Sequence, residues 1–164
     1  MKIFLSILFF ASFVIFPLSA FPSYGVQDSL PNINLILDGI NATLNEFYLY
    51  AENMFKQMVN SDSQNPAGYF FLGALYQAEM MDYEGDFKEE EFYTTLETAI
   101  RLAKKRIKTG NETSWDYLYL GNSYGYLGVY KARKGSWWSA FRSALKAKSA
   151  FKKAVELDST LYDA

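Results

Sequence analysis

The stretch YLYLGNSYG, Tyr117–Gly125, places two glycines among tyrosines and leucines in a segment whose apolar spacing otherwise predicts a helix. A second stretch, YFFLGALYQ, Tyr69–Gln77, lies 48 residues upstream, and its Tyr, Leu, Gly and Tyr fall at the same positions. Glycine costs up to about 1 kcal/mol in a helix interior. The recurrence of glycine at the same position of both stretches therefore indicates that two helices pack closely at these points and that the helix continues through them.

Helically spaced apolar residues, separated by short polar breaks, predict an all-α fold with no strands. The predicted helices are Asn41–Val59, Ala67–Met81, Phe87–Lys108, Trp115–Lys134 and Ser136–Leu157. Ser114 is the predicted N-cap of the fourth of these helices.

In the last predicted helix, a rotation of about 100° per residue separates an apolar face from a basic one. The predicted inward face consists of Trp137, Ala140, Phe141, Ala144, Ala147, Phe151, Ala154 and Val155, and Arg142, Lys146 and Lys153 lie opposite it. Trp138 falls towards the polar side and is the exception.

The residues shared by the two stretches, with those that follow the second, form a repeat signature. They are Tyr69, Leu72, Gly73 and Tyr76 in the first unit, and Tyr117, Leu120, Gly121, Tyr124, Ala147, Phe151 and Ala154 in the second. This set resembles the tetratricopeptide repeat (TPR) family, with its pattern W-x2-L-G-x2-Y…A-x3-F…P. The first unit departs from that pattern, with Ala103 for the phenylalanine and Arg106 for the next small residue. The resemblance implies antiparallel helix pairs stacked as a TPR-like α-solenoid.

The repeat of 48 residues is longer than the family period of about 34. Tyr76 to Ala99 and Tyr124 to Ala147 both span 23 residues, so the extra length lies between the same landmarks in each unit. We expect the two helices of a unit to share it at about seven residues each, close to two helical turns, which keeps the buried face in phase. Gly73 and Gly121 should then lie where the first helix of a unit meets the second.

Residues 1–20 have the layout of a secretory signal peptide, with Lys2, an apolar run and small residues at Ser19 and Ala20. The predicted organisation is a signal peptide (1–20), an N-terminal lead (21–40) and a TPR-like domain (41–164), which contains a partial unit (41–65), two units (66–113 and 114–161) and the start of another (162–164). The predicted location is periplasmic or secreted. The last helix pair lacks a polar cap, so the sequence predicts that further chain or a partner covers this end, or that the protein self-associates through it.

The chain contains no histidine and no cysteine. These absences remove the usual general base, the thiolate nucleophile and the commonest metal ligands. The acid-rich run from Asp82 to Glu91 begins with the spacing of a calcium loop, but Tyr93 stands where such a loop has glutamate. We therefore predict a protein that is not an enzyme, with no catalytic, metal or cofactor-binding residues.

Charge is divided between the two halves: residues 21–97 carry a net charge of −11 and residues 98–164 one of +8. A basic surface suits nucleic acid or anionic lipid. The predicted export argues against nucleic acid, and an anionic membrane surface is the alternative partner.

The TPR resemblance implies that the first helices of successive units line a partner-binding groove. The predicted groove residues are Phe70, Ala74, Gln77, Leu118, Asn122 and Tyr126. Most are apolar, which suits an apolar or aromatic segment of another protein and not the carboxylate clamp of some family members. The sequence therefore predicts an exported protein-interaction scaffold. The alternatives are that these residues are simply core, that the basic half docks on lipid, or that the chain is part of a longer ligand-binding or enzymatic protein.

Overall fold

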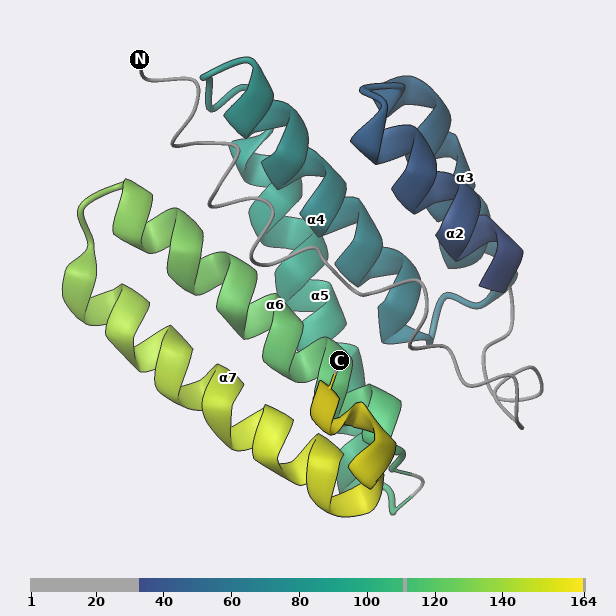
Figure 1. Ribbon diagram of the computed structural model, residues 1–164, viewed down its shortest axis with the longest axis vertical. Helices are drawn as coiled ribbons and strands as arrows, with labels where there is room; N and C mark the ends of the chain where they lie inside the picture. The colour runs from purple at the N-terminus through teal and green to yellow at the C-terminus, as the bar shows by residue number, and fades with distance from the viewer. Residues whose placement is uncertain (1–32, 111, 164) are drawn as a thin grey trace.

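The computed structural model describes residues 33–110 and 112–163, and these are helical throughout their regular structure, with no strand (Figure 1). The predicted signal peptide (1–20) and the lead as far as residue 32 lie outside the described residues. Within the described part of the chain, no helix has the length and apolar character needed to cross a membrane.

The helices are α2 (Ile33–Leu44), α3 (Tyr48–Ser61), α4 (Pro66–Asp82), α5 (Glu89–Lys108), α6 (Ser114–Arg133) and α7 (Trp137–Leu157), followed by the 3-10 helix η3 (Ser159–Asp163). The all-α prediction is confirmed. Helices α4 to α7 begin and end within two residues of the predicted limits.

The prediction of one helix over Asn41–Val59 is wrong, because a tight turn divides this segment into α2 and α3. Glu46 adopts a left-handed conformation with φ of 63°, and the Phe47 amide donates to the Ala42 carbonyl at 2.9 Å. Neither glycine nor proline marks this turn, and the apolar spacing continues across it, so periodicity alone did not reveal it. The predicted lead (21–40) is therefore helical from Ile33 onwards.

The start of α6 differs by one residue from the prediction, because Thr113 and not Ser114 is the N-cap. The Thr113 side chain accepts a hydrogen bond from the Asp116 amide, and the Asp116 carboxylate accepts one from the Thr113 amide at 2.9 Å. This reciprocal capping box satisfies amide groups that a helix start leaves without intrahelical partners.

Each helix packs against its neighbour in the chain, and the helices form the pairs α2–α3, α4–α5 and α6–α7. Successive pairs are joined by α3–α4 and α5–α6 contacts, and α4 also contacts both α2 and α6. Figure 1 shows the three pairs side by side, from the blue N-terminal pair to the yellow-green C-terminal one. One apolar core runs from Ile36 in α2 to Ala150 in α7. The described chain thus has a helical, repeat-like fold.

In each of the three pairs a glycine of the first helix lies against a large side chain of the second. A Cβ atom added to Gly39 would lie 2.4 Å from Phe55 Cε1, and one added to Gly121 would lie 2.6 Å from Phe151 Cε1. The corresponding distance from Gly73 to Leu96 Cδ2 is 2.4 Å. The prediction that Gly73 and Gly121 mark close helix contacts within a pair is confirmed.

The glycine contacts also show where the extra residues are accommodated. Gly39 precedes Phe55 by 16 residues, whereas Gly121 precedes Phe151 by 30 residues. The same glycine–phenylalanine contact therefore joins residues that are 14 positions further apart in the last pair than in the first. Helix α3 has 14 residues while α5 and α7 have 20 and 21, so the second helices are longer by about two turns. In the middle pair the phenylalanine position is Ala103, and Leu96, which lies two turns earlier, fills the space above the glycine.

The inward face predicted for α7 is partly wrong. Its buried residues are Ser143, Ala147, Ala150 and Ala154, whereas Trp137 and Phe141 are 72% and 52% exposed. Near the start of α7 the two helices are close, since a Cβ added to Gly128 would lie 3.3 Å from Ser143 Cβ, whereas further along α7 the Phe151 ring fits against Gly121. The large side chains at the start of α7 are therefore left on the outside.

Replacement of Gly73 by alanine should destabilise the fold by about 1–2 kcal/mol. The new methyl group overlaps Leu96, which is fully buried and has no room to move. Overpacking costs about 1–3 kcal/mol, and the better helix propensity of alanine recovers up to about 1 kcal/mol. Urea denaturation of the wild type and the variant measures the difference.

Gly121→Ala is the comparison, and it should cost less, because the partly exposed Phe151 ring can shift. In a double-mutant cycle, the variant with both Gly73→Ala and Leu96→Ala should lose less unfolding free energy than the two single variants lose in total. An unchanged or higher stability of Gly73→Ala would mean that the pair does not need the glycine.

Candidate functional site

A row of aromatic side chains follows the contact between α4 and α6. The rings of Trp115 and Tyr119 are 6.1 Å apart, Tyr119 lies 5.8 Å from Phe70, and Phe70 meets Tyr126 edge-on at 5.6 Å. Edge-to-face and tilted contacts at these distances are favourable arrangements for aromatic rings. The row joins the N-terminal turn of α6 to the middle of both helices.

The predicted groove residues lie on these two helices but differ in exposure. Phe70, Gln77 and Leu118 are buried, whereas Ala74, Asn122 and Tyr126 are partly exposed. The rings of Phe70 and Tyr126 are in contact with each other. Half of the set thus belongs to the interior of the protein, and the accessible part of this face is made by the other three residues.

Gln77 is the one residue in the described part of the chain with a buried side-chain oxygen or nitrogen that lacks a hydrogen-bond partner. Its Oε1 atom is unpaired, and its amide nitrogen contacts only Met81 Sδ, at 3.8 Å. A buried acceptor without a donor costs about 1–3 kcal/mol. Because Oε1 is buried and Gln77 is only 5% exposed, this cost falls on the interior of the protein and not on the accessible part of the face.

A cavity of about 310 Å³ lies at the end of the aromatic row, where α4 and α6 begin. Its lining residues are Ile36, Asn65, Ala67, Arg106, Thr113, Ser114, Trp115, Asp116, Tyr119 and Asp158. Trp115 and Tyr119 belong both to the cavity wall and to the row, so the cavity and the aromatic contacts form one continuous site.

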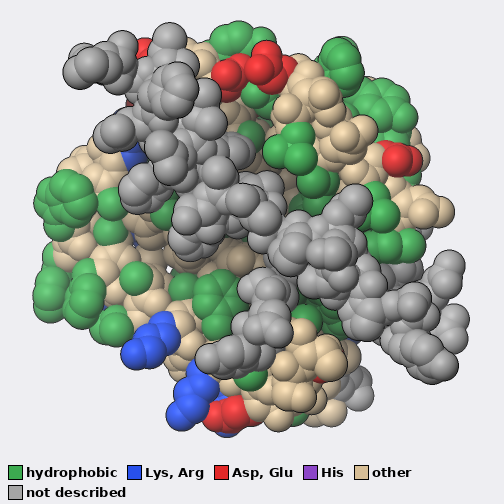
Figure 2. Space-filling model, in the orientation of Figure 1, with side chains coloured by type: hydrophobic (Ala, Val, Ile, Leu, Met, Phe, Trp, Pro, Cys, Tyr) green, Lys and Arg blue, Asp and Glu red, His purple; other side chains and the backbone are tan. Residues whose placement is uncertain are grey.

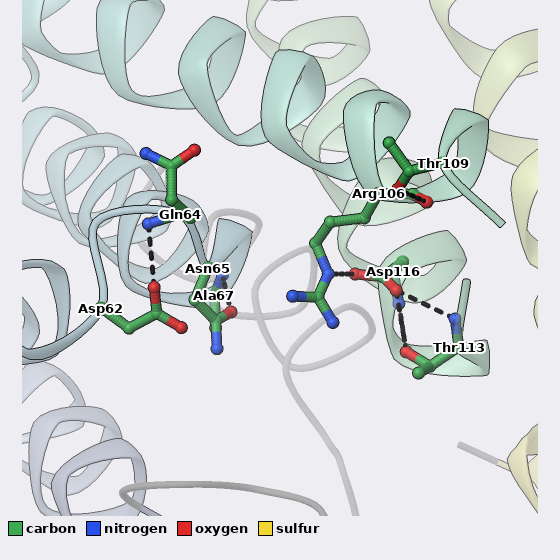
Figure 3. A network of polar contacts seen from close by, with 8 residues as sticks. All are labelled: Asp62, Gln64, Asn65, Ala67, Arg106, Thr109, Thr113 and Asp116. Atoms are coloured by element: carbon green, nitrogen blue, oxygen red, sulfur yellow. Dashed lines mark hydrogen bonds and ion pairs between the residues drawn. The ribbon is translucent and has the colours of Figure 1, made fainter. Parts of the chain in front are cut away.

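The polar wall of this cavity is an ion pair fixed by the start of α6 (Figure 3). Arg106 donates from Nε to the buried Asp116 Oδ1 at 2.6 Å, while Asp116 Oδ2 accepts from the Thr113 amide and hydroxyl. Figure 3 shows the two terminal nitrogens of the guanidinium pointing away from Asp116, and these nitrogens make no hydrogen bond to the described residues. Asp116 thus orients Arg106, and within the described part of the chain two guanidinium nitrogens remain available as donors to an anionic group.

The acid-rich run has a structural partner in the basic end of α6. Asp86 accepts hydrogen bonds from the Tyr130 hydroxyl and the Lys134 ammonium group, both at 2.9 Å, and it is also paired with Arg133. The bonds from Lys134 and then Tyr130 hold the pKa of Asp86 below its ordinary value. Among the described residues, no group of acids is arranged to hold a metal ion.

Comparison with protein-family models, with curated proteins and with solved structures finds no match to this chain.

The sequence did not reveal the cavity or the role of Arg106, which was interpreted as a departure from the repeat pattern and as one member of a basic set. The cavity draws on α2, the α5–α6 turn and the residue after α7, which are far apart in the chain. One local signal was present: Thr113 with Asp116 three residues later has the spacing of a capping box. That spacing identifies a polar helix start, but it does not identify the arginine that pairs with it.

The tyrosines of this interior predict a loss of stability at alkaline pH. Burial raises the pKa of Tyr126 to about 12 and raises the pKa of Tyr119 above its ordinary value of about 10. Burial, followed by hydrogen bonds to Glu52 and Asp86, raises the pKa values of Tyr76 and Tyr130. The stabilisation is complete below pH 10 and is lost as the pH rises towards 12, because the unfolded chain releases its phenolic protons first.

Urea denaturation at increasing pH, together with absorbance of the phenolate at 295 nm, measures both effects. The free energy of unfolding should fall above pH 10, and Tyr126→Phe should reduce its slope by up to about 1.4 kcal/mol per pH unit. Titration of every tyrosine near pH 10 in the folded protein, with constant stability, would contradict this prediction.

Proposed function

We propose that this protein is a TPR-like scaffold that binds a segment of another protein along the α4–α6 face. The observation that carries the proposal is the row from Trp115 to Tyr126, which starts at the cavity and ends at a partly exposed ring on the α4–α6 face. The proposal combines a repeat architecture with a peptide-binding surface.

The TPR-like part of the proposal rests on the three helix pairs and their glycines. Gly39 precedes Gly73 by 34 residues, which is the family period, although the next interval, to Gly121, is 48. Ala51 and Phe55 follow Gly39 at the spacing that the family uses for its small residue and phenylalanine, and both are buried. The first pair thus supports the resemblance with a unit of ordinary length, and the later pairs support it with lengthened helices.

The chemistry of the face favours an apolar peptide segment as the ligand. Aromatic side chains provide a large apolar surface for the side chains of a peptide. The free guanidinium nitrogens of Arg106, at the cavity end, suit an acidic side chain or a terminal carboxylate. We therefore propose a ligand with consecutive apolar residues and one acidic group at one end.

The proposal includes no catalytic step and no cofactor. The absence of histidine and cysteine from the sequence supports a binding role. The apolar run before Ala20 supports a site of action outside the cytoplasm, and we propose that the protein is exported.

Selection from a random peptide library on the purified protein tests the proposed ligand class. The selected peptides should share apolar and aromatic residues and an acidic group. Asn122→Arg, which adds a bulky charge on the partly exposed part of the face, should weaken their binding at least about tenfold in calorimetric titrations.

Glu97→Arg is the matched control, because it introduces the same side chain at an exposed position of α5, away from the face. It should leave peptide affinity unchanged. Equal loss in the two variants, or peptides that bind Asn122→Arg as tightly as wild type, would locate binding elsewhere.

Gln77→Met should separate stability from binding. Methionine removes a buried, unpaired oxygen at similar volume, so the free energy of unfolding should rise by about 1 kcal/mol or more. Affinity for the selected peptides should stay as in the wild type, because the buried oxygen is not on the accessible part of the face. A clear fall in affinity would contradict this placement of Gln77.

A further inference from the structure

The outer side of α7 carries an apolar stripe that the fold does not use. Trp138, Phe141 and Leu145 are 69%, 52% and 51% exposed, and their spacing places them on one side of the helix. The rings of Trp138 and Phe141 stack at a centroid distance of 5.8 Å. Trp137, at 72% exposure, extends this surface at the start of the helix. We refer to these four side chains as the α7 patch.

Basic side chains surround the α7 patch, and acidic ones are absent from its half of the helix. Arg142, Lys146 and Lys148 alternate with the patch residues, and the first acid of α7 is Glu156. Arg142 and Lys148 are exposed and form no ion pair with the described residues, while the Lys146 ammonium lies 5.2 Å from the Tyr124 ring centroid. Figure 2 shows hydrophobic side chains at the left edge, where α7 begins, with basic side chains below them along the helix.

The preceding repeat unit provides an internal comparison for these positions. Glu90 and Glu97 of α5 lie 48 residues before Trp138 and Leu145, and both glutamates are exposed although α6 packs on α5. A further helix pair placed on α7 as α6 is placed on α5 would therefore leave Trp138 and Leu145 uncovered. Continuation of the repeat does not account for these apolar residues.

Aromatic and basic residues on one outward helix surface are the combination that favours the interface of an anionic bilayer. Tryptophan and phenylalanine partition into the boundary between headgroups and acyl chains, and lysine or arginine beside them contacts anionic headgroups. Helix α7 has five basic residues and one acid, whereas the first turn of α5 is Glu89–Glu91. From this geometry and charge we propose that the α7 patch docks the protein on an anionic membrane surface.

This surface is separate from the proposed peptide-binding face. The patch lies on the side of α7 opposite Ser143, Ala147 and Ala150, which pack towards α6. A membrane-docked protein would therefore keep the α4–α6 face available for a ligand. The inference does not depend on the proposed scaffold function.

Flotation of the full-length chain with vesicles tests the proposal, with phosphatidylglycerol mixed into phosphatidylcholine and with phosphatidylcholine alone. We expect stronger binding to the anionic vesicles, and this preference should weaken as salt is raised from about 0.1 M to about 1 M, which shortens the Debye length from about 10 Å to about 3 Å. Trp138→Ser with Leu145→Ser should reduce partitioning at least about tenfold. Arg142→Gln with Lys148→Gln should reduce it by about 25-fold, since each basic residue near such a surface contributes about fivefold.

Two matched variants control for loss of apolar surface and of charge. Leu49→Ser with Tyr50→Ser removes exposed apolar side chains from α3, and Arg101→Gln with Lys108→Gln removes exposed charges from α5. Both should bind vesicles as the wild type does. All variants are full-length, so binding by any other part of the chain is common to each comparison, and circular dichroism checks that every variant is folded.

Wild-type affinity of the two patch variants for anionic vesicles would overturn the proposal, as would equal binding of the wild type to both kinds of vesicle. An exposed apolar patch can also be buried against a second copy of the chain, and light scattering detects such a dimer. A dimer that the Trp138→Ser, Leu145→Ser variant converts to a monomer, with vesicle binding unchanged, would assign the patch to a second copy of the chain and would also overturn the proposal.

Discussion

The close approach of the two helices in each pair is the constraint on which the rest of the structure depends. At Gly39, Gly73 and Gly121 there is no room for a Cβ atom, because a large side chain of the facing helix occupies that space. The helix propensity lost at each glycine is up to about 1 kcal/mol and is offset by contacts that a wider separation would forfeit. The approach also selects which side of each second helix faces inwards. Along the first half of α7 the residues that face α6 are small, and Trp137, Trp138 and Phe141 lie outside.

Polar contacts between turns and helix ends fix how one pair sits on the next. Asp86, in the turn between α4 and α5, holds the basic end of α6 through Tyr130 and Lys134. At the opposite end of α6, Asp116 pairs with Arg106 of α5 while it also caps its own helix. Both ends of α6 are therefore tied to the preceding pair, and the aromatic row is held between two fixed points. Burial orients the carboxylate of Asp116, which in turn orients the guanidinium that lines the cavity.

The two proposed surfaces follow from the same packing but have different chemistry. The α4–α6 face is largely apolar and aromatic, and it suits an apolar segment of another protein. The α7 patch is aromatic and basic, and it suits a surface that presents many anionic groups. The division of charge along the chain, net −11 before residue 98 and net +8 after it, places the basic surface on the later helices. A protein with both properties could hold a peptide near a membrane.

The sequence alone determined the all-α class, the limits of α4 to α7 and the close contacts at Gly73 and Gly121, because these depend on the spacing of residues along the chain. Tyr69–Gln77 and Tyr117–Gly125 were sufficient to predict that Gly73 and Gly121 face the second helix of their pairs. The turn at Glu46 was not predictable, because a left-handed residue without glycine has no local signature. Tertiary structure alone decided the burial of Phe70 and Leu118, the exposure of Trp137 and Phe141, and the cavity beside Arg106. Each of these depends on how closely a neighbouring helix approaches, and periodicity within one helix carries no information about that distance.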